Sequence, residues 1–223
     1  GKNDFTSATQ AIDPANVVKR SQHRLSRQDI SKNALKVLYR LQQSGYSAHI
    51  VGGGVRDLLL NHKPKDFDIA TNAHPKEIRA LFGNCRLIGR RFRLAHIRFG
   101  REIIEVATFR AAAGQDDKYA DMAHDDGGRI LRDNVYGSID EDVWRRDFTC
   151  NALYYNIADF SIWDYVGGVR DIEKRKLVLI GDPHKRFRED PVRMLRAVRF
   201  SAKLDFKIDD KTVEAMRGLT ELL

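Results

Sequence analysis

Two aspartates separated by one phenylalanine, Asp66 and Asp68, end the segment IVGGGVRDLLLNHKPKDFDI at residues 50–69. Alternate side chains of a β-strand point to the same face, so a strand here would place both carboxylates together. Clustered carboxylates repel one another unless a cation or a proton lies between them, and they suit Mg²⁺, which prefers hard oxygen ligands. The spacing therefore predicts that Asp66 and Asp68 are metal ligands.

Three consecutive glycines, Gly52 to Gly54, stand near the start of the same segment. They predict a turn between a strand over 47–51 and a short helix over 55–60. Glycine lets the backbone approach a phosphate closely, and a helix N-terminus directs unpaired N–H groups at an anion. Arg56 and Asp57 lie on the predicted helix, and one of them could face the site. The combination predicts a phosphate-binding turn beside a metal site.

Each half of this segment also has an ordinary structural explanation. Asp-x-Asp pairs are common on solvated strands, and glycine runs most often form simple turns. The two features occur one supersecondary unit apart, however, and their combination favours the functional interpretation.

The composition indicates a globular chain with an anionic partner. Of the 223 residues, 42% are hydrophobic and 31% are charged, which is enough apolar material for a core. The formal net charge of +8 and the pI near 9.5 favour a polyanion as partner. Cys85 and Cys150 have neither metal-ligand spacing nor a disulfide framework, so we expect a reducing, cytoplasmic setting. No apolar run approaches the length of a membrane span, and no signal peptide is recognisable.

A third carboxylate, Glu105, lies on a hairpin predicted over 93–109 that turns at Gly100. It shares a strand face with Ile103 and Ala107, and a carboxylate on an apolar face is costly unless a partner compensates it. An ion pair with an arginine and a third place in the metal site explain this position equally well.

The middle of the chain contributes Asp147 and Asn151. Residues 111–133 are poor in apolar side chains and predict a long mobile loop. A Ser-x-x-Glu capping box then begins a helix that we expect to run over 138–153. Asp147 and Asn151 are four residues apart and would share one face of that helix.

The sequence VGGVRD at 166–171 repeats the VGGGVRD at 51–57, after a second hairpin predicted over 153–165. No Asp-x-Asp pair follows this second copy. We therefore interpret it as a structural turn and not as a second active site.

Three arginines with almost no acidic neighbours lie at intervals of three along a helix predicted to begin at Pro191. They form a spiral stripe opposite three apolar residues, a pattern that a solvated amphipathic face would also produce. So much unpaired positive charge nevertheless favours a polyphosphate or RNA surface. The arginines are Arg193, Arg196 and Arg199, and the apolar residues are Leu195, Val198 and Ala202.

Five motifs in this order resemble those of the class II nucleotidyltransferases of the polymerase-beta superfamily. They are GGGVRD, DFDIAT, EVATFR, RRDFTCNAL and EDPVRMLRAVRF, and the resemblance spans about residues 31–210. The family comprises bacterial poly(A) polymerases and CCA-adding tRNA nucleotidyltransferases. The segment LIGRRFRLAHI at 87–97 is similar to a poly(A) polymerase signature, and the Gly-x-x-Gly-Thr-like pattern usual in CCA-adding enzymes is missing. The poly(A) polymerase branch is therefore favoured.

The resemblance implies an α+β fold, with a polymerase-beta-like head of mixed or antiparallel sheet flanked by helices and a mostly helical neck. We expect a flexible leader over 1–24, the catalytic head over 25–165, and neck and nucleotide-selection helices over 166–223. The chain begins with Gly and stops within a helical pattern. We therefore expect a piece of a longer protein that lacks further helical, RNA-binding regions.

The resemblance also implies template-independent addition of AMP from ATP to RNA 3′ ends, with release of pyrophosphate. Two Mg²⁺ ions on Asp66 and Asp68 would activate the 3′-hydroxyl and neutralise the triphosphate. Asp190 and Arg193 would read the edge of the adenine. Asp147, in the family's Arg-Arg-Asp motif, could address a metal or hold its neighbouring arginine and the ribose. The predicted catalytic residues are Asp66, Asp68, Asp147 and Glu105, and the predicted nucleotide-binding residues are Gly53, Gly54, Arg56, Arg146, Asn151, Asp190, Arg193, Arg196 and Arg199.

Two rival functions stay open on the sequence: a CCA-adding enzyme and a catalytically silent RNA-binding protein on the same fold. The intact Asp-Phe-Asp triplet argues against the silent protein, because a binding module needs no clustered carboxylates near a phosphate path. A Rossmann dinucleotide site would need a third glycine at another offset, and a P-loop would need Gly-Lys-Ser/Thr. The oligomeric state is not indicated.

Overall fold

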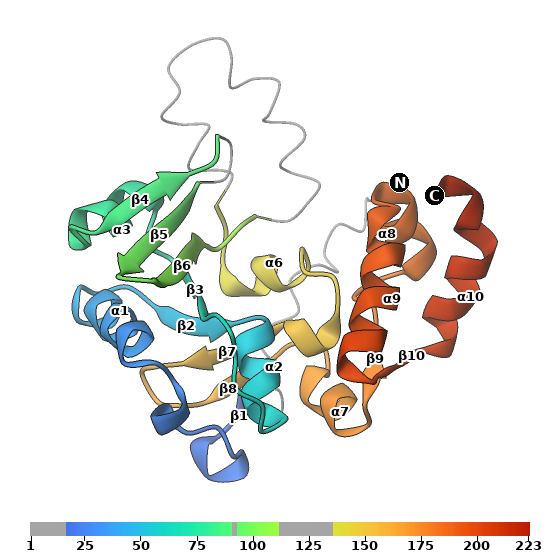
Figure 1. Cartoon of the computed structure of the whole chain (residues 1–223), viewed down its shortest axis with the longest axis horizontal. Coiled ribbons are helices and arrows are strands. Elements are labelled where there is room, and N and C mark those ends of the chain that lie inside the picture. The colour runs from blue at the N-terminus through green and yellow to red at the C-terminus, as the bar shows by residue number, and fades with distance from the viewer. Residues whose placement is uncertain (1–16, 91–92, 112–135) are drawn as a thin grey trace, which may run out of the picture.

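The computed structural model describes residues 17–90, 93–111 and 136–223, and its centre is an eight-stranded sheet (Figure 1). The strands lie in the order β1, β8, β7, β2, β3, β6, β5, β4; β3 and β6 are parallel, and all other neighbours are antiparallel. This mixed sheet with flanking helices confirms the predicted α+β fold. The strands are β1 (Val17–Val18), β2 (Ala48–Val51), β3 (Asp68–Thr71), β4 (Cys85–Ile88), β5 (Leu94–Phe99), β6 (Glu102–Thr108), β7 (Leu153–Asn156) and β8 (Ile162–Asp164).

The helices lie on both sides of the sheet and beyond one end of it (Figure 1). Two further short strands, β9 (Lys176–Leu177) and β10 (Lys207–Ile208), pair in parallel among the C-terminal helices. The α-helices of the described residues are α1 (Lys32–Gln43), α2 (Gly53–Leu59), α3 (Pro75–Leu81), α6 (Ile139–Val143), α7 (Gly168–Glu173), α8 (Pro183–Glu189), α9 (Val192–Leu204) and α10 (Asp210–Leu219). None of them has the length and apolar character needed to span a membrane.

One face of the sheet carries the larger hydrophobic core. Val37 and Leu38 of α1 and Ile78 of α3 belong to it with Ile97 and Ile104 of the sheet, all fully buried. Side chains alternate along each strand, so the intervening residues point to the opposite face. That face has a smaller apolar cluster, to which β2, β3, β7 and α6 contribute. Its members include Val51, Ala70, Phe109, Val143 and Tyr154.

The residues around α1 explain where it begins and ends. The Ser31 hydroxyl caps its first turn by accepting a hydrogen bond from the Ala34 N–H at 3.1 Å. Gly45 follows the last turn with φ of 89°, a left-handed conformation that glycine adopts without steric cost.

The long helix predicted over 138–153 is wrong. Its capping box forms, but α6 ends at Val143, and only a short 3-10 helix, η5 (Thr149–Asn151), continues the predicted span. Between the two, the Asp147 carbonyl accepts a hydrogen bond from the Ile180 N–H at 2.8 Å. A chain paired with a distant segment cannot also make the i to i−4 bonds of a helix. Tertiary pairing therefore overrides the local helical pattern.

The flexible leader predicted over 1–24 is wrong from Val17 onward, and residues 1–16 lie outside the described part. β1 pairs with β8, and the guanidinium groups of Arg20 and Arg27 lie 5.0 and 4.2 Å from the centre of the Phe160 ring. Strand pairing and cation–π contacts thus fasten this segment to the turn between β7 and β8. Apart from Ala111, the loop predicted over 111–133 lies outside the described residues.

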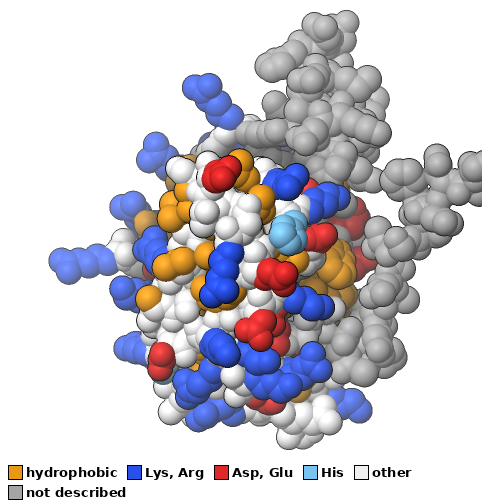
Figure 2. Space-filling view, turned by 90° about the vertical axis from the view of Figure 1, so that its right-hand side faces the viewer, with side chains coloured by type: hydrophobic (Ala, Val, Ile, Leu, Met, Phe, Trp, Pro, Cys, Tyr) orange, Lys and Arg blue, Asp and Glu red, His pale blue; other side chains and the backbone are white. Residues whose placement is uncertain are grey.

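The helix predicted from Pro191 is confirmed as α9, but its apolar face differs from the prediction. Leu195 and Val198 are 57% and 53% exposed, whereas Met194 and Ala197 are buried. Figure 2 shows Lys and Arg side chains spread over the face that carries the C-terminal helices, with acidic side chains between them.

Candidate active site

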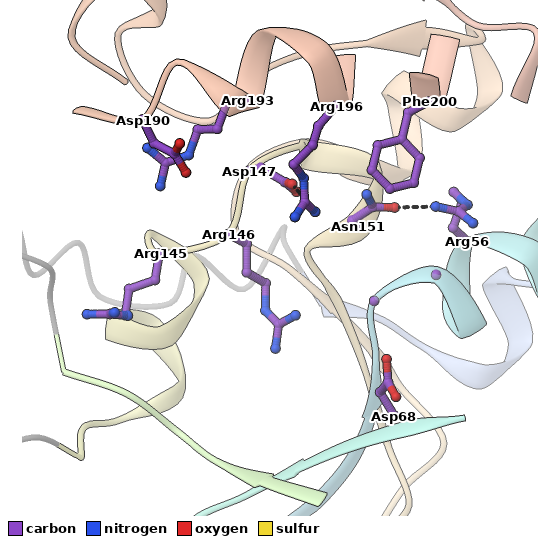
Figure 3. Close-up of a pocket in the computed structure, with 12 residues that line it drawn as sticks. Arg56, Asp68, Arg145, Arg146, Asp147, Asn151, Asp190, Arg193, Arg196 and Phe200 are labelled. Atoms are coloured by element: carbon purple, nitrogen blue, oxygen red, sulfur yellow. Dashed lines mark hydrogen bonds and ion pairs between the residues drawn. The ribbon is translucent and has the colours of Figure 1, made fainter. Parts of the chain in front are cut away.

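A cavity of about 440 Å³ lies where four segments far apart in the sequence meet (Figure 3). The glycine turn before α2 and the first residue of β3 form one side of it. Residues from the stretch between α6 and β7 and from the α8–α9 corner form the other. The lining residues are Gly52, Gly53, Arg56, Asp68, Arg145, Arg146, Asp147, Asn151, Asp190, Arg193, Arg196 and Phe200.

The glycine turn is open towards this cavity. Gly52 has φ of 70° and ψ of −142°, and α2 begins directly after it, at Gly53, two residues earlier than predicted. Among the described residues, no side chain caps the helix. A Cβ atom on Gly52 would lie 4.0 Å from Asp68 Oδ2, so the turn and the carboxylate are neighbours, as the sequence predicted.

Arg56 lines the cavity, but its guanidinium group is already bonded within the protein. Its Nη1 donates to Asn151 Oδ1 at 2.6 Å, and its Nε donates to Asp57 Oδ1 at 3.1 Å. The side chain is buried. Arg56 therefore ties α2 to η5, and together they form one wall of the site.

Asp68 and Glu105 lie side by side on the parallel strands β3 and β6. The pKa of Asp68 is raised to about 7, first by burial and then by the charge and hydrogen bonding of Glu105, while the nearby Arg146 opposes the shift. Glu105 pairs with His96, whose Nε2 lies 3.5 Å from Glu105 Oε1. No arginine among the described residues pairs with Glu105. The structure instead places Glu105 beside Asp68, which is the second of the two explanations.

The position of Asp66 differs from the predicted one, on the same strand face as Asp68. β3 begins only at Asp68, so Asp66 precedes the strand and side-chain alternation does not bring the two carboxylates together. Asp66 is exposed and does not line the cavity, although its charge contributes to the raised pKa of Asp68. The other predicted residues that do not line the cavity are Gly54, Glu105 and Arg199.

Arg146 is held by two residues that the sequence did not single out. Its Nε donates to the Tyr154 hydroxyl at 2.9 Å, and its Nη2 donates to Asp142 Oδ2 at 3.2 Å. The Tyr154 hydroxyl donates in turn to the same carboxylate oxygen at 2.6 Å. The other oxygen, Asp142 Oδ1, accepts from the Arg110 N–H at 3.0 Å. This buried network aims a fixed positive charge at the cavity and at Asp68.

Asp147 faces the cavity and pairs with α9. Its Oδ2 lies 2.5 Å from Arg196 Nη2, and its Oδ1 accepts from the Phe148 N–H at 2.8 Å. In this conformation Asp147 holds Arg196 and not its neighbour Arg146. Asn151 shares the cavity with Asp147, although the helix that was predicted to place them on one face does not form.

Asp190 and Arg193 both line the cavity, at the corner between α8 and α9. Asp190 Oδ1 accepts from the Val192 N–H at 3.2 Å, and Arg193 Nη1 donates to the Arg186 carbonyl at 3.1 Å. The two side chains are not bonded to one another, so hydrogen-bonding capacity of both remains for a ligand.

Sequence reasoning included Gly52 only as part of the glycine turn, and it did not single out Arg145 or Phe200 as site residues. The Phe200 ring lies 5.7 Å from the guanidinium carbon of Arg56 and 5.8 Å from that of Arg196. Phe200 follows Arg196 by four residues along α9, so the helical spacing could have indicated it. An aromatic ring beside the cavity offers a surface for stacking against a base.

The donor set suits Mg²⁺, although no group of three or more His, Cys, Asp or Glu among the described residues is arranged to hold a metal. Asp68 and Glu105 supply hard oxygen atoms, and a cation beside them would offset the burial and the like charge that raise the pKa of Asp68. Mg²⁺ is commonly bound by one or two carboxylates together with substrate phosphates and water.

The sheet, the glycine turn and the basic cavity define a nucleotidyltransferase head, and solved structures share this architecture. The CCA-adding enzyme of Bacillus stearothermophilus in complex with CTP matches with a TM-score of 0.70 and 34% identity, over 85% of this chain and 42% of that one. A CCA-adding enzyme in complex with ATP matches with a TM-score of 0.65 and 25% identity, over 87% and 43% of the two chains.

The family model of the poly A polymerase head domain matches residues 48–178 of this chain. The chain therefore belongs to this family. Poly(A) polymerase I of Salmonella typhi is 59% identical over 208 residues, which is 93% of this chain and 45% of that protein. The CCA-adding enzyme of Lactobacillus helveticus is 39% identical over 195 residues, or 87% and 46% of the two. The chain thus spans about half the length of the curated relatives it matches.

Proposed function

We propose that this chain carries the catalytic and nucleotide-selecting part of a polynucleotide adenylyltransferase, which adds AMP from ATP to RNA 3′ ends. The observation that carries the proposal is the placement of Asp68 beside an uncapped glycine turn, in a cavity lined by five arginines. Such a cavity suits a triphosphate on one side and a reacting hydroxyl near the carboxylates on the other. The greater identity to poly(A) polymerase I than to CCA-adding enzymes favours adenylate addition.

Each part of the cavity has a role in this proposal. The backbone N–H groups at Gly53 and the guanidinium of Arg146 bind the triphosphate, and Arg196 and Asp147 hold the ribose. Asp190 and Arg193 hydrogen-bond to the edge of the adenine. The protein needs no nucleophile of its own, because the RNA hydroxyl attacks the α-phosphate and pyrophosphate leaves.

Asp68, with Glu105 beside it, would hold Mg²⁺, and Asp66 is close enough to influence the ion through its charge. The ion would neutralise the triphosphate and lower the pKa of the attacking hydroxyl. A cytoplasmic setting also remains part of the proposal, since both cysteines are unpaired in the described structure.

The test is incubation of the protein with Mg²⁺ and an unstructured RNA, with labelled ATP or labelled CTP offered separately. We expect incorporation from ATP as long A tails, little from CTP, and none by the Asp68→Ala variant. Asp190→Ala is expected to relax the choice between the two nucleotides. Normal extension by Asp68→Ala would contradict the metal assignment.

A CCA-adding activity is the second candidate, because solved relatives are described in complex with CTP as well as ATP. Addition limited to a few C and A residues on a tRNA without its 3′ end would establish it. Absence of any incorporation, with RNA binding retained, would instead indicate a silent RNA-binding protein.

A further inference from the structure

A strongly basic hairpin leads away from the candidate active site along one face of the sheet. From residue 78 to residue 101 the sequence contains seven arginines and no acidic residue. This stretch includes β4 and β5, and β4 is the outermost strand at its end of the sheet. Uncompensated charge of this density is destabilising by itself and favours a polyanionic partner.

The strand register places part of this charge in line with the catalytic carboxylate. Asp68 pairs with Glu105, Glu105 with His96, and His96 with Arg86, each on the next strand of the sheet. Directly paired residues point to the same face. The row therefore runs from β3 across β6 and β5 to β4 over three strand spacings, or about 14 Å.

Arg98 widens this row on β5, two residues from His96 and on the same face. Both Arg86 and Arg98 are exposed, and neither has an ion pair with any described residue. Ile88, on the same face of β4, is also 41% exposed. The opposite face of these strands is buried against α1 and α3, so the row lies on the more exposed of the two faces.

We infer that the row of His96, Arg86 and Arg98 binds the sugar–phosphate backbone of the RNA strand just upstream of its 3′ end. The inference rests on the proposed function, since it places the reacting hydroxyl at Asp68 and Glu105. A single-stranded polyanion fits the row because neither arginine has an ion pair with a described residue and the row is continuous with the site. A second copy of this chain, pairing along the free edge of β4, is the occupant to be excluded.

The test is the affinity of a fluorescently labelled, unstructured RNA of about 12 nucleotides for the 223-residue chain, without ATP, over a series of salt concentrations. The double variant Arg86→Gln/Arg98→Gln is compared with Lys76→Gln/Arg79→Gln. Lys76 and Arg79 are exposed on α3, behind the sheet, so the control removes the same charge from the opposite face.

We expect the first double variant to weaken RNA binding roughly tenfold and to reduce the slope of log K against log salt by about 1.4, or 0.7 for each lost phosphate contact. The control is expected to change affinity less than twofold. In the transfer assay, the first double variant is expected to raise the KM for RNA and to leave the KM for ATP unchanged. The rise in the KM for RNA should be smaller with a dinucleotide primer, which is too short to reach the row.

Equal effects of the two double variants would overturn the inference, because overall charge would then explain the binding. So would unchanged RNA binding together with a change in sedimentation, which would identify the row as an interface between two copies. If the wild-type chain binds RNA through Arg86 and Arg98 but transfers no AMP, the proposed function fails and the binding row stands. If it transfers AMP without dependence on these arginines, only the row fails.

Discussion

Two glycine turns of nearly the same sequence follow two strands that run in the same direction. β2 and β8 lie on either side of β7, each antiparallel to it, and lead into α2 and α7. In the second turn Asp164 supplies an anion: its Oδ1 accepts from the N–H groups of Gly167 and Gly168 at 2.9 and 2.8 Å, and its Oδ2 from that of Val169 at 3.0 Å. The first turn has one more glycine, and among the described residues no side chain caps the helix that follows it.

Asp164 makes the second turn part of the scaffold, whereas the first turn belongs to the candidate site. A turn that presents N–H groups binds an anion in either case. The second turn receives it from its own strand, and the first is left open for a ligand. Both turns also brace η5: Arg56 donates to Asn151 at 2.6 Å, and the Thr149 hydroxyl donates to Asp171 at 2.6 Å.

The two carboxylates should separate chemistry from stability. Asp68→Asn is expected to reduce AMP transfer by roughly 1000-fold, or about 4 kcal/mol, without lowering the free energy of unfolding. Asp164→Ala is expected to cost about 2–4 kcal/mol of stability, because several N–H groups lose an ionised acceptor. Urea unfolding and labelled-ATP incorporation measure the two effects. Loss of transfer in a fully stable Asp164→Ala protein would mean that the second turn is also catalytic.

Substitution of a glycine should likewise reduce stability in the second turn and nucleotide binding in the first. A Cβ on Gly168 would lie 2.2 Å from the Thr149 carbonyl oxygen, so Gly168→Ala is expected to destabilise the protein by about 3 kcal/mol or more. A Cβ on Gly53 would meet only the end of the Arg56 side chain, at 3.0 Å. Gly53→Ala is therefore expected to leave the unfolding midpoint nearly unchanged and to raise the KM for ATP. Similar midpoints for both variants would break the comparison.

Two neighbouring tyrosines offer a finer test. Tyr154 binds Arg146 beside the first turn, whereas the Tyr165 hydroxyl, near the second, is buried without a hydrogen-bond partner among the described residues. Their rings lie 6.3 Å apart. Tyr154→Phe is expected to raise the KM for ATP about fivefold, the equivalent of one hydrogen bond of about 1 kcal/mol that positions Arg146. Tyr165→Phe, which removes the same atom from the same cluster, should change the KM by less than a factor of two.

The smallest effect concerns pH in the absence of metal. The pKa of Asp68 is raised to about 7, mainly by burial, so between its ordinary value of 3.8 and about 7 the folded protein retains a proton that the unfolded chain has released. Stability should therefore fall as the pH rises through this window, and Asp68→Asn should fall less steeply. Unfolding midpoints in a chelator, compared with those in Mg²⁺, measure the difference. Equal slopes for wild type and variant would contradict the assignment.

Much of the local structure followed from residues close together in the sequence. The cap and apolar spacing of α1, the hairpin of β5 and β6, and the position of Asp68 after the glycine turn all depend on neighbours within a few residues. The failures lie where distant segments intervene. The chain leaves its helical pattern near Asp147 because it pairs with residue 180, and the segment from Val17 is ordered because it pairs with β8.

Residue types and their spacing identify the components of the candidate site: an Asp-x-Asp pair, an anion-binding turn and a surplus of arginines. The tertiary structure decided which of them meet. In the folded chain Asp66 does not line the cavity, Glu105 pairs with His96, and Asp147 pairs with Arg196. Asp164 accepts hydrogen bonds from the N–H groups of one of the two similar turns. Residue type and spacing fix the chemistry that a side chain can perform. The side chain's partners depend on strand register and on contacts between distant segments, which the packing of the whole core selects.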